Sequence, residues 1–334
     1  MIPLSSKSQI MILGTGVAVP QKRITAEELD QQLGLPSGES LRVTGIRQRF
    51  IAEDETAAEL AAAASEQALQ AAGLSWKDVD LLVCASGTMD QALPYNAALV
   101  NAELGITDHR LATLDIGASC LSFLQALDVV SCVLSTERYR RAVIVSADIA
   151  SCATDFRNLR ENGIFGDGAA AAVISPSPPK ESSCILAAHS TTFPEGVDYC
   201  QIPGGGSRFY RPGGNPHARI LFEMKGKQLF ALVRKTLPGF VEVLLRKAGI
   251  EVAELACFIP HQASQQALDH VARLLGFDDG RMIDVFTDYG NQVGASLPTA
   301  LHFAVTQGRL KRGDKALLLG TGAGVSIGGI VLVY

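Results

Sequence analysis

A cysteine at the start of a predicted helix is the group in this sequence best placed to act as a nucleophile. Cys120 follows an apolar strand pattern, Leu111 to Ile116, and precedes a helical pattern that begins at Leu121. The positive end of a helix dipole at this position should lower the pKa of the thiol and favour the thiolate. Small residues just before it, Gly117 to Ser119, leave room for a substrate carbonyl. Because most cysteines of intracellular proteins are small core residues, position alone also allows a structural thiol.

Three further segments offer partners for this thiol. His261 directly follows the strand pattern Cys257 to Ile259, at the carboxyl end of a strand, where catalytic groups of α/β folds collect. Asn291 lies in a Gly-Asn turn between a second strand pattern, Met282 to Phe286, and a helical pattern. The glycine-rich turn from Gly320 to Gly324 ends another strand and offers backbone N–H groups. Taken singly, the histidine could be a structural hydrogen-bonding residue and the asparagine a simple turn residue.

The sequence contains an internal duplication of the elements that would position these groups. The matched segments keep their order, and they are 68–83 with 244–259, 117–119 with 294–296, and 142–146 with 316–320. This duplication places Asn291 a few residues before the counterpart of Cys120, so the thiol and the amide can converge from two halves. The polar, proline-rich stretch 175–183 predicts the boundary between a half formed by 1–175 and a half formed by 184–334.

Composition and strand pattern predict a soluble α/β protein. The chain has 334 residues, of which 47% are hydrophobic and 19% charged, which is ample for a large core. The expected strands are almost continuously apolar, as in sheets covered by helices on both faces. The formal net charge of -5, without a Lys/Arg run, argues against nucleic acid as a partner. The glycine-rich stretch 203–215 lacks the strand-turn-helix context of a phosphate loop and is expected to be a surface loop.

Cysteine usage and hydropathy predict a cytoplasmic protein without a metal centre. The seven cysteines are scattered and show no CxxC spacing, which fits neither a disulfide framework nor a zinc site. The histidines have no metal-ligand spacing to one another. No apolar run approaches the 18 residues of a membrane span, and the N-terminus lacks the pattern of a signal peptide. Neither a metal, a membrane span nor a secretion signal is therefore expected.

Over essentially its whole length, the chain resembles the β-ketoacyl-acyl-carrier-protein synthase III family. The matches occur in the family's order, and they are Thr44-Gly45-Ile46-Arg47, Ser119-Cys120, Phe165-Gly166-Asp167-Gly168-Ala169, Pro260-His261-Gln262-Ala263, Gly290-Asn291 and the glycine-rich final turn. The resemblance implies the thiolase fold, in which two duplicated α/β halves form a five-layer αβαβα body, usually as a homodimer. It also implies a Cys-His-Asn site formed by Cys120, His261 and Asn291, with no cofactor.

The chemistry implied by the resemblance is a decarboxylating condensation. Cys120 would take an acyl group from a thioester of coenzyme A or of acyl carrier protein, and the backbone N–H groups of Cys120 and Ala323 would meet the oxyanion. A malonyl thioester would then lose carbon dioxide while His261 and Asn291 donate hydrogen bonds to its thioester oxygen. Two alternatives remain. One is a non-decarboxylating acyltransferase that moves the acyl group to an amine or hydroxyl, and the other is a non-catalytic partner subunit.

Departures from the family concern the binding of the acyl donor. Coenzyme-A-binding members carry a tryptophan shortly before Thr-Gly-Ile-Arg and an arginine upstream of Phe-Gly-Asp-Gly, which sandwich the adenine. Here residues 37–43 contain no tryptophan, and Arg157 and Arg160 lie outside the usual spacing. Leu93 and Tyr95 stand on the loop expected to reach the partner's pocket, where the family usually has Phe-Pro-Ser. We expect Leu93 and Tyr95 to shape the substrate pocket, and the sequence does not assign acetyl-coenzyme A as the primer.

Overall fold

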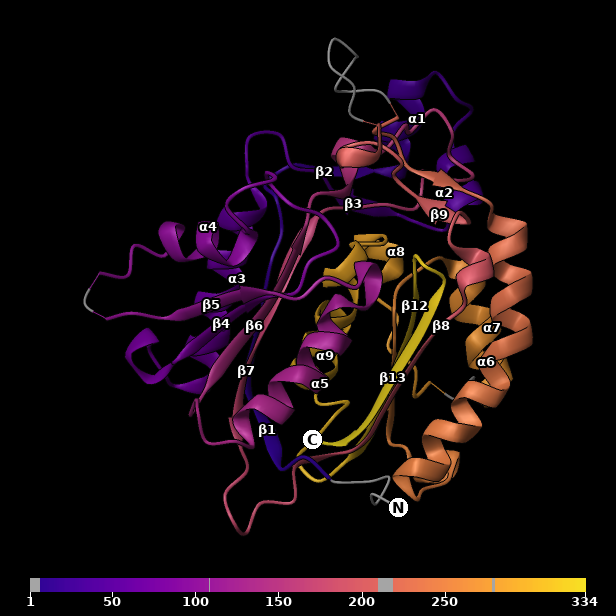
Figure 1. The fold of residues 1–334 in the computed structure, drawn as a ribbon. Helices are drawn as coiled ribbons and strands as arrows, with labels where there is room; N and C mark the ends of the chain where they lie inside the picture. Colours follow the sequence, from indigo (N-terminus) through magenta and orange to yellow (C-terminus); the bar gives the residue numbers. More distant parts are fainter. Residues whose placement is uncertain (1–6, 108, 210–218, 278–279) are drawn as a thin grey trace.

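Two β-sheets dominate the computed structural model, which describes residues 7–107, 109–209, 219–277 and 280–334 (Figure 1). The strands of the N-terminal sheet, in spatial order, are β1 (Ile10–Ala18), β7 (Gly168–Pro176), β6 (Ala142–Asp148), β4 (Leu81–Cys84) and β5 (Ala112–Asp115). Those of the C-terminal sheet are β8 (Cys184–Thr192), β13 (Ser326–Val333), β12 (Lys315–Gly322) and β11 (Cys257–Pro260). In both sheets one strand runs antiparallel to its two neighbours, β7 in the first and β13 in the second. The two sheets therefore repeat one topology, as the internal duplication predicted.

One predicted strand, Met282 to Phe286, is largely absent. Met282 makes a single parallel bridge with Phe258 of β11, at the place that β5 occupies in the other sheet. Beyond it, the side chain of Gln262 accepts hydrogen bonds from the N–H groups of Val285 (2.9 Å) and Phe286 (3.1 Å). Because a side chain takes these donors, the segment leaves the ladder and enters the short helix α8 (Phe286–Tyr289). The strand prediction was wrong beyond its first residue.

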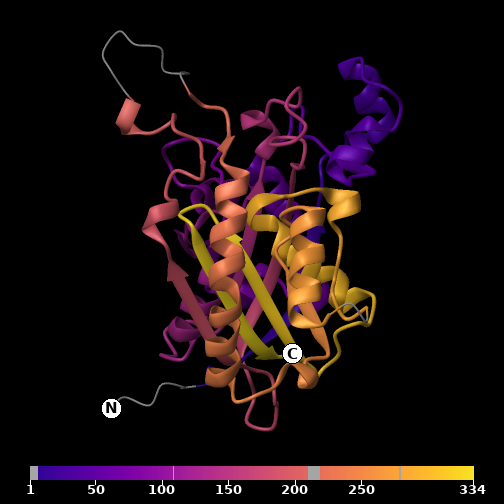
Figure 2. The ribbon, with the colours of Figure 1, turned by 90° about the vertical axis from the view of Figure 1, so that its right-hand side faces the viewer.

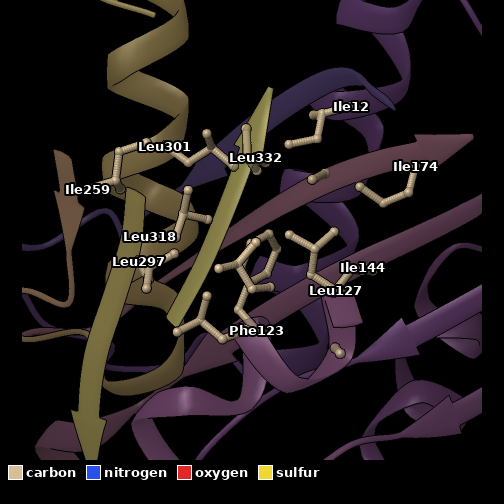
Figure 3. Close-up of a cluster of buried hydrophobic side chains, with 14 of the residues drawn as sticks. Ile12, Phe123, Leu127, Ile144, Ile174, Ile259, Leu297, Leu301, Leu318 and Leu332 are labelled. Atoms are coloured by element: carbon tan, nitrogen blue, oxygen red, sulfur yellow. The ribbon is translucent and has the colours of Figure 1, made fainter. Parts of the chain in front are cut away.

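Helices α5 (Ser122–Leu134) and α9 (Ser296–Thr306) lie between the two sheets and form the middle layer. Both are apolar around most of their circumference, which is typical of a helix buried on all sides. Figure 3 shows how their side chains meet those of both sheets. The labelled residues of this shared core are Ile12, Phe123, Leu127, Ile144, Ile174, Ile259, Leu297, Leu301, Leu318 and Leu332.

Outer helices cover the remaining face of each sheet. On the N-terminal sheet these are α3 (Ala57–Ala72) and α4 (Asn96–Glu103), and on the C-terminal sheet α6 (Gly226–Ala248) and α7 (Gln265–Leu275) (Figures 1 and 2). Gly73 and Gly249 end α3 and α6 with φ of 65° and 68°, the left-handed caps that the sequence predicted. The five layers are those of the αβαβα architecture expected from the sequence.

Short elements gather at the end of the molecule where α5 and α9 begin, drawn at the top of Figure 1. They are β2 (Arg23–Thr25), α1 (Ala26–Leu33), α2 (Glu39–Thr44), β3 (Gln48–Phe50), β9 (Cys200–Gln201) and β10 (Glu223–Met224). The predicted surface loop 203–215 is described up to residue 209, as irregular chain that ends in a short 3-10 helix, Ser207–Phe209, and its residues 210–215 lie outside the described part. Within the described ranges, no helix has both the length and the apolar character that a membrane crossing requires.

Candidate active site

Cys120 lies in a one-turn 3-10 helix, Ser119–Leu121, that leads directly into α5. Ser119 adopts a positive φ of 53°, which turns the chain sharply before the helix. The hydroxyl of Ser122 accepts a hydrogen bond from the N–H of Ala118 (2.9 Å) and lies 3.1 Å from the carbonyl oxygen of Ser86. The turn that carries Cys120 is therefore held both by its own helix and by the loop after β4.

The same turn occurs at the start of α9. Val293 has a φ of 52°, and the hydroxyl of Ser296 accepts a hydrogen bond from the N–H of Gln292 (2.8 Å). Matching Ser119 with Val293 makes Gly294 the counterpart of Cys120, so the register predicted from Gly117 to Ser119 was displaced by three residues. A Cβ atom on Gly294 would lie 3.0 Å from Asp148 Oδ2. The second turn therefore has little room for a side chain, and the duplicated pair holds one thiol.

The end of β12 lies between His261 and the turn that holds Cys120. The N–H of His261 donates to the carbonyl oxygen of Leu319 (2.8 Å), the last step of the pairing between β11 and β12. A Cβ atom on Gly320 would lie 2.9 Å from the Cβ of His261 and 3.0 Å from a methyl group of Leu121. A Cβ atom on Gly322 would lie 3.6 Å from the backbone nitrogen of Cys120. These glycines let the strand end lie between His261 and the Cys120 turn.

Asn291 is held on all sides by backbone groups. It is 5% exposed, and its N–H donates to the carbonyl oxygen of Ile164 (2.7 Å). Its side-chain Oδ1 accepts from the N–H of Val293 (2.9 Å), and Nδ2 donates to the carbonyl oxygen of Ala263 (3.3 Å). Ala263 in turn donates to the carbonyl oxygen of His261 (2.9 Å). The amide and imidazole are thus fixed on connected segments, and an amide nitrogen has a second hydrogen to donate.

Phe165-Gly-Asp-Gly-Ala169 is more than the tight turn that its composition suggests. A Cβ atom on Gly166 would lie 2.3 Å from the carbonyl oxygen of Tyr289, and one on Gly168 would lie 2.1 Å from Gln292 Nε2. The motif therefore needs glycine because it lies directly against the segment that carries Asn291. The N–H of Gly166 also donates to the carbonyl oxygen of Asn291 (3.2 Å).

Arg49 supports this motif and was not singled out from the sequence. It is 2% exposed, and its guanidinium donates to the carbonyl oxygens of Gly163 (2.5 Å) and Phe165 (2.9 Å). Burial lowers its pKa to about 10, which leaves it charged at neutral pH. No local pattern separates it from Arg47, the exposed partner of Asp288 two residues earlier, because residues i and i+2 of an extended segment share a face.

The Cys120 thiol does not have the lowered pKa that was expected from the helix dipole. Burial raises its pKa well above the ordinary value, and the nearby Cys200 and Asp148 raise it further. Backbone N–H groups of Cys120 and Ala323 lower the pKa, but by less than burial raises it. The prediction of a lowered pKa was therefore wrong for the free protein, because desolvation of a thiolate outweighs the helix end. The role of Ala323 beside the oxyanion stays a prediction.

His261 is neutral at physiological pH. Burial lowers its pKa to about 4, and no carboxylate in the described part of the chain opposes the shift. Its buried Nδ1 has no hydrogen-bond partner among the described residues. The site therefore combines a protonated thiol, a neutral imidazole and a carboxamide, a set rich in donors and poor in bases.

These pKa directions make a prediction about Cys120 in the free protein. Alkylation by iodoacetamide requires the thiolate, so its rate at Cys120 should keep rising with pH above 9, beyond the ordinary thiol pKa. The measurement is the second-order labelling rate at a Cys120 peptide between pH 6 and 10, with exposed Cys132 as the internal reference. A rate that levels off below pH 7 would show that the thiolate is already stabilised and would contradict the raised pKa.

Leu93 and Tyr95, predicted to shape the pocket, lie on the exposed loop between β4 and α4. Leu93 is 83% exposed, and Tyr95 is 44% exposed with its hydroxyl 2.8 Å from Thr113 Oγ1 of β5. Within one chain they face solvent at the outer edge of the N-terminal sheet, so a role in a pocket depends on a second copy.

A cavity of about 260 Å³ lies beside the β9–β10 ribbon. One of its walls is Phe222, whose ring meets that of Phe165 edge-on at 4.9 Å. Four carboxylates line it, those of Asp155, Glu161, Asp198 and Glu223. Among the described residues, no group of three or more His, Cys, Asp or Glu side chains is arranged to hold a metal ion.

Comparison with known proteins gives one consistent family. Residues 114–193 match the family model described as 3-oxoacyl-[acyl-carrier-protein (ACP)] synthase III, and residues 245–334 match the model of its C terminal. The β-ketoacyl-[acyl-carrier-protein] synthase III of Sphingopyxis alaskensis is 33% identical over 323 residues, which covers 96% of this chain and 98% of that protein. A crystal structure of 3-oxoacyl-[acyl-carrier-protein] synthase III from Aquifex aeolicus has a TM-score of 0.87 at 29% identity and covers 97% of this chain and 100% of that one. The corresponding synthase structure from Pseudomonas aeruginosa has a TM-score of 0.87 at 28% identity and covers 98% of both chains.

Proposed function

The chain belongs to the β-ketoacyl-[acyl-carrier-protein] synthase III family of thiolase-fold condensing enzymes, and from this premise we propose the reaction and the residues that carry it. Cys120 accepts an acyl group from an acyl thioester, and the acyl-enzyme condenses with a malonyl thioester in fatty-acid or specialised lipid synthesis. The observation that carries the proposal is the position of the Cys120 thiol. The turn that holds it lies beside the segments of His261 and Asn291.

In the first half-reaction the sulfur of Cys120 attacks the thioester carbonyl and the donor thiol leaves with a proton. The tetrahedral oxyanion lies against the backbone N–H groups of Cys120 and Ala323, the same donors that lower the pKa of the thiol. Since the free thiol is protonated, the thiolate forms as the donor binds, and the departing thiolate takes up the proton.

Decarboxylation is the task of the other two residues. Loss of carbon dioxide from the malonyl thioester places negative charge on its thioester oxygen, which accepts hydrogen bonds from His261 Nε2 and Asn291 Nδ2. The resulting carbanion attacks the carbonyl carbon of acyl-Cys120, and the β-keto thioester leaves as the Cys120 thiolate is released and takes up a proton from solvent. Loss of carbon dioxide itself generates the carbanion, so no base has to remove a proton from the malonyl unit.

A non-decarboxylating acyltransferase is the alternative with a different product. Transfer to an amine or hydroxyl requires a base that removes the acceptor's proton during attack. Asn291 cannot serve as a base, and His261, with its pKa near 4, is a weak one. The test is to mix the enzyme with an acyl thioester and an amine or hydroxyl acceptor, with and without malonyl thioester, and to weigh the product. A β-keto thioester supports condensation, whereas an amide or ester that forms without malonyl thioester contradicts it.

The partners that we propose are acyl-coenzyme A or acyl-carrier protein as donor, malonyl-carrier protein as extender, and a second copy of this chain. The edge strand β5 has no outer neighbour in the described chain, and Leu114 on it is 37% exposed. Met89, Leu93 and Tyr95 add exposed apolar surface from the neighbouring loop. Such an edge is suited to a homodimer. All seven cysteines are free, in keeping with a reducing cytoplasm.

Selection of the donor should not depend on the adenine of coenzyme A. Trp76 bonds to Glu66 at a helix–strand turn, and Arg157 is paired with Asp155 at the cavity that four carboxylates line. Aromatic stacking of a base is worth roughly 1–3 kcal/mol in nucleic-acid complexes. Without it, kcat/KM for one acyl group should be similar on coenzyme A and on truncated pantetheine, and carrier protein should be the best donor. A strong preference for coenzyme A over pantetheine would contradict this prediction.

A further inference from the structure

Asp148, the last residue of β6, is a fully buried carboxylate for which the proposed reaction has no chemical use. It is 0% exposed and accepts hydrogen bonds from both halves of the chain. Its Oδ1 accepts from the N–H groups of Gly87 (2.8 Å) and Thr88 (2.7 Å) and from the Thr88 hydroxyl (2.9 Å). Its Oδ2 accepts from the N–H of Ala295 (3.2 Å), in the turn before α9.

From each of these partners a short chain of contacts leads to a residue of the proposed site. On one side, Gly87 and Thr88 follow Ser86, whose carbonyl oxygen lies 3.1 Å from the Ser122 hydroxyl that holds the Cys120 turn. On the other side, Ala295 shares a single turn with Val293, whose N–H donates to Asn291 Oδ1. Asp148 is therefore the shared acceptor between the segments of the thiol and the amide.

The segment of the thiol and the segment of the amide also meet at Gly87. A Cβ atom on Gly87 would lie 2.5 Å from a methyl group of Val293 and 3.3 Å from the carbonyl carbon of Ser119. Ser119 and Val293 are the two positive-φ residues that start the duplicated turns. The carboxylate thus acts where a small displacement changes the position of Cys120 relative to Asn291.

Ionisation of Asp148 does not stabilise the folded protein. Burial raises the pKa of Asp148 to about 6, although four donors face it. The folded protein therefore binds a proton at this group more tightly than the unfolded chain, and stability decreases as pH rises from about 4 to 6. The titratable groups that sense its charge are the thiols of Cys84 on β4 and of Cys120.

We propose that Asp148 is a positioning residue that sets the separation between the Cys120 thiol of one half and the Asn291 amide of the other. This inference rests on the proposed function. Acylation uses Cys120 and the backbone donors beside it, whereas condensation needs Cys120 and Asn291 in register. Loss of the carboxylate should therefore impair condensation more than acylation.

Asp148→Asn tests this, because the amide keeps the shape of the side chain but turns one acceptor into a donor that faces other donors. The readouts are the single-turnover rate of Cys120 acylation and the rate of carbon dioxide release from malonyl thioester by pre-acylated enzyme. We expect the second rate to fall about 10- to 100-fold, as misplacement of a reacting group typically causes, and the first to change less than threefold. Asp30→Asn is the matched control, since Asp30 is 2% exposed and accepts three hydrogen bonds from Gly38 and Ser40. It should leave the ratio of the two rates unchanged.

If Asp148→Asn leaves the ratio of the acylation rate to the decarboxylation rate unchanged, whether or not both rates fall, the inference is overturned. If Asp148→Asn does not fold, Gly294→Ala decides, because its new Cβ would lie 3.0 Å from Oδ2 and push the Asn291 turn away from the carboxylate. It should show the same selective loss, and an unchanged ratio there would count against the inference. Wild-type enzyme that releases no carbon dioxide would instead contradict the proposed function.

Discussion

Cys120→Ala should abolish acyl transfer and leave the fold intact. Removal of the nucleophile in an enzyme that works through an acyl-enzyme costs on the order of 10⁶-fold in kcat. The fold should tolerate the change, because the turn around Cys120 is held by the Ser122 hydroxyl and by backbone groups rather than by the thiol. Incubation of wild-type enzyme with an acyl thioester should add one acyl mass to a peptide that contains Cys120, and the variant should gain none.

Two other cysteines provide the controls for this experiment. Cys152 is exposed and Cys84 is buried in β4, so together they report on non-specific labelling of accessible and of core thiols. Cys152→Ala and Cys84→Ala should both retain the acyl-enzyme and its turnover. Acyl label that persists in Cys120→Ala, or that lies on Cys84 or Cys152, would disprove the assignment of the nucleophile.

His261→Ala and Asn291→Ala should divide the two half-reactions. Each variant removes a donor to the charge that develops during decarboxylation, and loss of one such donor typically costs about 100- to 1000-fold. Acylation of Cys120 relies on backbone donors, so its rate should change much less. The measurement is acyl-enzyme formation by quenched mass spectrometry beside carbon dioxide release from malonyl thioester.

Asn291→Asp keeps the shape and the acceptor of the side chain but removes its donor. The carboxylate can still accept from the N–H of Val293, but it has no hydrogen to offer the substrate. It should therefore lose decarboxylation to at least the extent of Asn291→Ala, and its melting temperature should fall because a carboxylate oxygen then faces the carbonyl oxygen of Ala263. Equal loss of both half-reactions in all three variants would indicate misfolding or a different role for these residues.

Much of this architecture could be predicted from the sequence because its signals are local. Buried strands such as β6 and β12 are continuously apolar, and the glycines that end α3 and α6 mark their helix boundaries. The duplication then indicated that Cys120 and Asn291 approach each other from two halves. Gly320 and Gly322, which have no side chains, let the end of β12 lie between His261 and the Cys120 turn.

What the sequence did not reveal depends on burial and on distant partners. The raised pKa of Cys120 comes from desolvation, which no local pattern around a helix start reports. The segment after Met282 leaves the sheet because Gln262, some twenty residues earlier, takes its backbone donors. Asp148 and Arg49 have the same character, since each is a charged residue whose hydrogen-bond partners lie far away along the chain.

The central claim is that acyl-Cys120 is consumed by decarboxylative condensation. The most direct measurement is a single turnover in which isolated acyl-enzyme is mixed with malonyl thioester labelled in its free carboxyl group. The account predicts one carbon dioxide released and one β-keto thioester formed for each acyl-Cys120 lost. Acyl-enzyme that persists with malonyl thioester, or that transfers its acyl group to an amine or hydroxyl without release of carbon dioxide, would contradict it.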